Sequence, residues 1–94
     1  MRELILTSKF KKSFATFIKN HPFLKTKIYK TLEIMKLDIF SPILSSHKLS
    51  GELMGLRACS CGYDCRIIFS IEKHQDSDIE YIILLDIGTH DEVY

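Results

Sequence analysis

The sequence predicts an α+β domain in which a two-helix hairpin packs on one face of an antiparallel sheet. Three observations support this prediction: an apolar segment close to the N-terminus, apolar residues at helical spacing between positions 10 and 39, and strand-like apolar segments between positions 56 and 87. The chain has 94 residues, of which 46% are apolar, so we expect one domain, spanning residues 1–94, with its own core.

The first 39 residues are expected to form a strand and then the helical hairpin. Residues 3–6 are mostly apolar and suit a strand, and Thr7 or Ser8 can cap the helix that follows. Apolar side chains at positions 10, 14, 17 and 18 form one stripe of that helix. Pro22 suits the first turn of a second helix, whose apolar stripe continues to Ile39 before Pro42 ends it.

Three strands are expected in the rest of the chain, connected as a meander. The first covers about residues 56–61, and residues 62–64 suit a tight turn into the second, about residues 65–72. A polar turn over residues 74–78 precedes the last strand, residues 79–87. This strand is apolar on both faces, as expected for a central strand. One face is predicted to carry Ile79, Tyr81, Ile83, Leu85 and Ile87, and the other Ile82 and Leu84.

Charge is distributed unevenly along the chain. The net charge is +1, but residues 1–57 hold eleven basic and four acidic residues, whereas residues 58–94 hold two basic and eight acidic residues. The basic part suits a polyanion partner, and it also suits an ordinary solvated surface rich in lysine. We find no secretory signal pattern and no apolar run long enough to span a bilayer, so we expect a cytoplasmic protein with no membrane partner.

Three cysteines, Cys59, Cys61 and Cys65, lie close together. An odd number in one cluster predicts reduced thiols rather than a disulfide framework. A zinc site is the alternative, but the spacing differs from the usual two-residue knuckle. We therefore expect no metal site and no cofactor, and we expect Cys65, which alternates with apolar residues, to be buried.

Four polar side chains lie where loops are expected to meet strands: His47, Asp64, His90 and Tyr94. Histidine acts as an acid or a base near neutral pH, and arginine and lysine bind phosphate oxygens. This combination suits metal-free cleavage of RNA, in which a base activates a ribose 2′-hydroxyl and an acid protonates the leaving 5′-oxygen. The residues assigned to RNA or phosphate binding are Lys48, Arg57 and Arg66.

Each of these residues also has a structural explanation. Asp64 follows Gly62 in a turn, where aspartate is favoured. The two histidines can be ordinary loop residues, and Tyr94 can be a frayed end. Arg57 can pair with an acid of the later strands, and Arg66 can pair with Asp64, because the two alternate onto one face.

Three motifs occur in order along the chain. They are His47-x-Leu49-x-Gly51-x-x-x-Gly55-x-Arg57, Asp64-x-Arg66-Ile67-Ile68-Phe69 and Ile87-Gly88-Thr89-His90-x-x-Val93-Tyr94. With the order of strands and helices, they resemble the RelE/ParE superfamily of bacterial toxins, closest to its YafQ-like branch and to the RelE/StbE-type mRNA interferases. The resemblance implies a RelE-like microbial RNase fold. It also implies a toxin of a type II toxin–antitoxin system that cleaves mRNA in the ribosomal A site without a metal. Its partners would be the ribosome, mRNA and a cognate antitoxin.

The resemblance also implies a role for each matched residue. His90 would be the general acid, Asp64 the base or the group that orients one, and His47 a ligand of the phosphate. Tyr94 would stack on a base or contact the phosphate.

Two departures from the family leave alternatives open. Ser60 stands where the YafQ-like pattern has a histidine, and Cys61 stands where the RelE branch has an arginine, so Arg57 or Arg66 would supply the missing cation. One alternative is a ParE-like poison of DNA gyrase, which has no need of the two histidines and Asp64. The other is a catalytically degenerate toxin that only binds its antitoxin.

Overall fold

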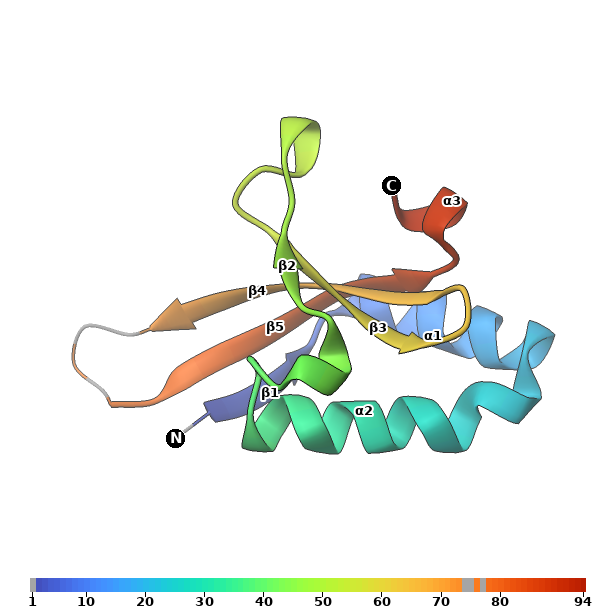
Figure 1. Ribbon diagram of the computed structural model, residues 1–94, viewed down its shortest axis with the longest axis horizontal. Coiled ribbons are helices and arrows are strands. Elements are labelled where there is room, and N and C mark those ends of the chain that lie inside the picture. Colours follow the sequence, from blue (N-terminus) through green and yellow to red (C-terminus); the bar gives the residue numbers. More distant parts are fainter. Residues whose placement is uncertain (1, 74–75, 77) are drawn as a thin grey trace.

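The computed structural model describes residues 2–73, 76 and 78–94, so the turn predicted over residues 74–78 lies largely outside the described residues. Within them, five strands form one sheet in the order β1-β5-β4-β3-β2. The strands are β1 (Arg2–Leu6), β2 (His47–Lys48), β3 (Arg57–Gly62), β4 (Cys65–Lys73) and β5 (Glu80–Gly88), and the helices are α1 (Ser8–Asn20), α2 (Lys25–Leu37) and α3 (His90–Val93). The hairpin of α1 and α2 lies on one side of the sheet, and α3 and the β2–β3 connection rise on the other (Figure 1).

The predicted α+β class and the β3–β4–β5 meander are confirmed, but the sheet is mixed rather than antiparallel. Strand β1 pairs in parallel with β5. The segment that contains the helical hairpin carries the chain from β1, at one edge of the sheet, to β2 at the opposite edge, and the meander then runs back until β5 lies beside β1. The two-residue strand β2, which pairs with β3, was not expected, since two residues show no alternation. Helix α3 was also missed, although Thr89 followed by Glu92 has the spacing of a capping box.

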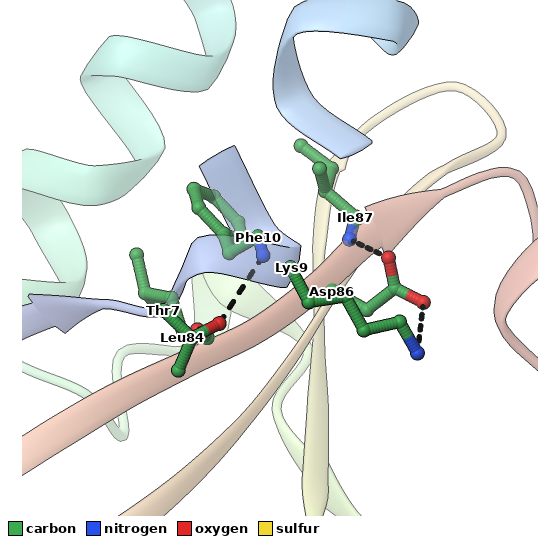
Figure 2. A network of polar contacts seen from close by, with 6 residues as sticks. All are labelled: Thr7, Lys9, Phe10, Leu84, Asp86 and Ile87. Atoms are coloured by element: carbon green, nitrogen blue, oxygen red, sulfur yellow. Dashed lines mark hydrogen bonds and ion pairs between the residues drawn. The ribbon is translucent and has the colours of Figure 1, made fainter. Parts of the chain in front are cut away.

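Thr7 fixes the start of α1, as expected, and ties it to the sheet. Its hydroxyl oxygen accepts a hydrogen bond from the Phe10 amide at 3.1 Å and donates one to the Leu84 carbonyl at 2.7 Å (Figure 2). Next to it, Lys9 Nζ lies 3.5 Å from the Asp86 carboxylate. These contacts hold the N-terminal end of α1 against β5.

Helix α2 differs from the prediction at both ends. Pro22 starts a short 3₁₀ turn, Pro22–Leu24, and the α-helix begins only at Lys25. It ends at Leu37, because Asp38 adopts an extended conformation. Ile39 is nevertheless fully buried, so it belongs to the core without belonging to the helix. None of the helices in the described residues is long and apolar enough to cross a membrane.

The predicted faces of the last strand are partly wrong. Between β4 and β5 the register shifts by one residue: Ile68 lies opposite Asp86, and Phe69 lies opposite Leu84. The extra residue is Leu85, so the alternation changes phase there. As a result, Ile87 lies in the core with Ile82 and Leu84. Strict alternation had placed it on the opposite face.

Phe69 is fully buried in the middle of this core. We expect Phe69→Ala to lower the free energy of unfolding by about 3–5 kcal/mol, because it removes a large apolar side chain and leaves a cavity. Phe23→Ala is the matched control, since Phe23 is 76% exposed and should change stability little. Urea unfolding curves of both variants measure the difference, and equal midpoints would contradict the assignment of Phe69 to the core.

Candidate functional site

A cavity of about 510 Å³ lies on the side of the sheet that the helical hairpin leaves open. Its lining residues are His47, Lys48, Leu49, Ser50, Glu52, Leu53, His90 and Tyr94. Four residues singled out in the sequence therefore meet there, although up to 47 positions separate them in the chain. The other four belong to the segment after β2, which includes the 3₁₀ turn Gly51–Leu53. These four residues were not predicted, because residues of these common types indicate no particular chemistry in a sequence.

The short helix α3 presents His90 and Tyr94 together. The Thr89 hydroxyl accepts from the Glu92 amide at 3.3 Å, and the Glu92 carboxylate accepts from the Thr89 amide at 2.8 Å. The Tyr94 amide donates to the His90 carbonyl at 3.1 Å. The two rings meet edge to face, with centroids 4.6 Å apart, so Tyr94 limits the orientations open to the imidazole.

Asp64 lies beside the cavity rather than in its lining. It sits in the turn after Gly62 with a left-handed backbone, φ +49°. Its Oδ1 accepts a hydrogen bond from the His90 amide at 3.0 Å. Asp64 is thus both a turn residue and a direct neighbour of His90, and it holds the backbone that carries the imidazole.

Arg66 lies on β4, directly opposite Ser60 of β3. Its guanidinium donates to the Cys65 carbonyl at 3.0 Å and to the Gly62 carbonyl at 3.5 Å, which differs from the pairing with Asp64 considered above. Partial burial raises the pKa of Tyr94 above its usual value, and the nearby positive charge of Arg66 partly opposes this rise. Tyr94 therefore keeps its phenolic proton at neutral pH.

Arg57 is not brought to this cavity. Its guanidinium carbon lies 5.2 Å from the ring centroid of Phe40, and that of Arg2 lies 5.4 Å from the same ring. Arg57 and Cys59 are two residues apart on β3, so their side chains lie on the same face of the sheet. The Cys59 thiol contacts the sulfur of Met35 on α2. The side chain of Arg57 thus belongs to the helix-covered side of the sheet.

The cysteines correct the prediction of three reduced thiols. Cys61 and Cys65 form a disulfide, with Cα atoms 5.0 Å apart, and Cys59 is free and buried. The tight turn between β3 and β4 brings the first two together across the hairpin, a proximity that spacing alone does not reveal. In the described residues, no group of three or more His, Cys, Asp or Glu side chains is placed to hold a metal ion.

Burial raises the pKa of the Cys59 thiol to about 12, an effect that the charge of Arg66 only partly offsets. An ordinary thiol is half ionised near pH 9, whereas Cys59 stays protonated there. We therefore expect native protein to resist iodoacetamide at about pH 9. Mass spectrometry should find one alkylated cysteine only after unfolding without reductant. Modification of the native protein at the rate of a free thiol would contradict this burial.

No family model and no curated protein matches the chain. Among solved structures, it is similar to a copper-bound mutant toxin from Helicobacter pylori (22% identity, TM-score 0.78, 100% of both chains covered). It is also similar to a YoeB/ParE toxin from Agrobacterium tumefaciens (12% identity, TM-score 0.73, 94% of this chain and 98% of that one).

A third similar structure is the DinJ-YafQ toxin–antitoxin complex of E. coli, with 18% identity and a TM-score of 0.68 over 99% of this chain and 97% of that one. Each of these matches covers at least 94% of this chain rather than one motif. The predicted resemblance is confirmed at the level of the fold: the chain folds as the YafQ and YoeB/ParE toxins do.

Proposed function

We propose that the chain is the toxin of a type II toxin–antitoxin system, an endoribonuclease that cleaves mRNA in the ribosomal A site. The observation that carries the proposal is the cavity in which His47, His90 and Tyr94 meet. A protein that only binds gyrase or an antitoxin has no need of two histidines facing one cavity. The shared fold supports the toxin assignment, and the DinJ-YafQ complex supports an antitoxin as partner.

In this proposal His90 is the general acid. Its ring is 63% exposed at the cavity, and Nδ1 lies 3.5 Å from the Asp91 carboxylate, which pairs with the protonated form. The imidazolium donates its proton to the 5′-oxygen as the bond from that oxygen to phosphorus breaks.

In this proposal His47 takes the proton of the 2′-hydroxyl, in place of Asp64, the base that the resemblance implied. Its Nδ1 lies 3.2 Å from the Ser45 carbonyl, which only accepts hydrogen bonds, so Nδ1 carries a proton and the lone pair of the neutral imidazole is on Nε2. The 2′-oxygen then attacks the adjacent phosphorus. Asp64 acts by orienting His90, because its carboxylate is engaged with the His90 amide.

Cations at the cavity stabilise the charge that develops on the phosphate. Lys48 belongs to the lining, and Arg66 lies near Tyr94 and opposite Ser60, where the YafQ-like pattern has a histidine. We propose that Arg66 replaces that histidine as a cation, although it does not transfer protons. Arg57 has no part in this proposal, since it lies over Phe40.

The lysines of the helical hairpin have a separate use. They are exposed on α1 and α2, and they are Lys11, Lys12, Lys19, Lys25, Lys27, Lys30 and Lys36. We propose that they contact phosphates of ribosomal RNA, which carry no sequence information. The ribosome would then hold the toxin while the cavity meets the message, in the cytoplasm.

The test is expression of the chain in bacteria, followed by primer extension on a reporter message. We expect growth arrest and cuts at codon-defined positions. A matched message without a start codon should stay intact, because it does not enter the A site. Arrest with intact messages and a DNA-damage response would favour the gyrase alternative. No arrest and no cleavage would favour the degenerate toxin.

A further inference from the structure

We propose that the Cys61–Cys65 disulfide positions His90 through Asp64, and that reduction of this bond weakens the cleavage proposed above. The disulfide closes a ring around the turn Gly62-Tyr63-Asp64 at the tip of the β3–β4 hairpin. The consequence for cleavage rests on the proposed function, whereas the positioning of His90 does not.

The turn has a left-handed backbone at two positions, which its residue types tolerate but which the disulfide closure helps to keep in place. Gly62 has φ +134°, and Asp64 has φ +49°, in the left-handed region that costs a residue with a side chain free energy. Tyr63 between them is 95% exposed and contributes little packing. Aspartate is favoured in such a turn, but little side-chain packing adds to that preference, so the disulfide is the strongest constraint on where Asp64 lies.

The disulfide anchors the turn to the core. Cys61 and Cys65 are 1% and 0% exposed and belong to the core cluster. The turn also approaches the connection between α1 and α2 closely, since a Cβ built on Gly62 would lie 3.2 Å from the Leu24 side chain. One side of the turn is thus tied to the buried side of the sheet.

The other side of the turn reaches the candidate site. Asp64 Oδ1 accepts from the His90 amide at 3.0 Å, and the His90 ring packs against Tyr94. A continuous series therefore links the sulfur atoms to His90: the covalent ring that contains Asp64, and one hydrogen bond from Asp64 to the His90 amide. Beyond it, the His90 ring contacts Tyr94. Cys59 does not disturb the pairing, because its buried thiol stays protonated and protonated thiols are poor nucleophiles.

Reduction by a small-molecule dithiol breaks the sulfur–sulfur bond. The dithiol supplies two electrons and two protons, Cys61 and Cys65 become thiols, and the reductant closes to a cyclic disulfide. The open turn then samples more conformations, so the Asp64–His90 hydrogen bond is formed for a smaller fraction of the time. Because both sulfurs are buried, the reductant reaches them only when the turn opens, and reduction should be slow.

The experiment measures hydrogen exchange of the His90 amide by NMR, since this amide is the donor to Asp64. Oxidised protein is compared with protein reduced by dithiothreitol, and thiol titration checks one and three free thiols respectively. We expect exchange to accelerate about 10-fold on reduction, as local opening becomes easier. The same treatment of Cys59→Ser, which keeps the disulfide, should give the same acceleration.

The double variant Cys61→Ser, Cys65→Ser should show the fast exchange without any reductant. If it fails to fold by circular dichroism, the reduced wild-type protein still gives the answer. Message cleavage on programmed ribosomes should fall about 10-fold on reduction, as expected when an acid is misplaced. An unchanged His90 exchange rate in fully reduced protein overturns the proposal, and so do three free thiols in non-reduced protein. Faster exchange with no cleavage in either state supports the positioning and counts against the proposed function.

Discussion

His90→Ala is expected to lower message cleavage on programmed ribosomes by about 10²- to 10⁴-fold, the usual contribution of one general acid. The imidazole is the proton donor proposed for the leaving 5′-oxygen, and it faces the cavity from the first residue of α3. Alanine keeps the backbone amide that Asp64 holds, so the helix should remain in place. The measurement is the single-turnover cleavage rate, and in cells the growth arrest should disappear.

The matched control for this variant is His21→Ala. His21 lies on the helical side, where its ring contacts Phe17 and Phe23, and it is not part of the cavity lining. Its removal should leave the cleavage rate close to that of the wild type. A His90→Ala protein that folds and cleaves at the wild-type rate would refute the assignment of the acid.

Asp64→Ala is expected to lower cleavage by about 10²-fold, a loss typical of a catalytic group displaced by about 1 Å. The variant removes the acceptor of the His90 amide and loosens the start of α3. Asp64→Asn should retain most of the activity, because an amide oxygen accepts the same hydrogen bond. An amide cannot act as a base, so this variant removes only the role of a base.

This pair of variants separates the role of general base, which the resemblance implied for Asp64, from the orientation of His90 through its amide. If Asp64 is the general base, asparagine and alanine should be equally damaging. If it orients His90, only alanine should be. Single-turnover rates for both variants at one pH settle the comparison, and His90 amide exchange should accelerate in the alanine variant alone.

Much of the fold could be predicted from local patterns. Strands β3, β4 and β5 each start and end within one residue of the predicted positions, because buried strands have a clear apolar signal. The end of α2 was less well predicted, since Ile39 continues the helical spacing after Asp38 has left the helix. The phase of β5 was not predictable, because one extra residue at Leu85 depends on the pairing with β4.

The candidate site was predicted in part. His47, Lys48, His90 and Tyr94 meet at one cavity, as the order of motifs suggested. Asp64 lies next to it through its hydrogen bond to the His90 amide. Arg57 was assigned to RNA binding because it belongs to a motif. Strand alternation turns its side chain to the helix-covered side of the sheet, where the guanidinium lies over the Phe40 ring.

The sequence by itself determined the order of the elements, the apolar faces of most of them and the chemical types available for a site, because these depend on neighbours within a few residues. The tertiary structure decided what depends on contacts between distant segments. It made the sheet mixed, by pairing β1 with β5, and it joined Cys61 to Cys65. It also placed the Asp64 carboxylate on an amide 26 residues further along the chain. Pairing, register and turn geometry set such contacts, and residue spacing does not contain them.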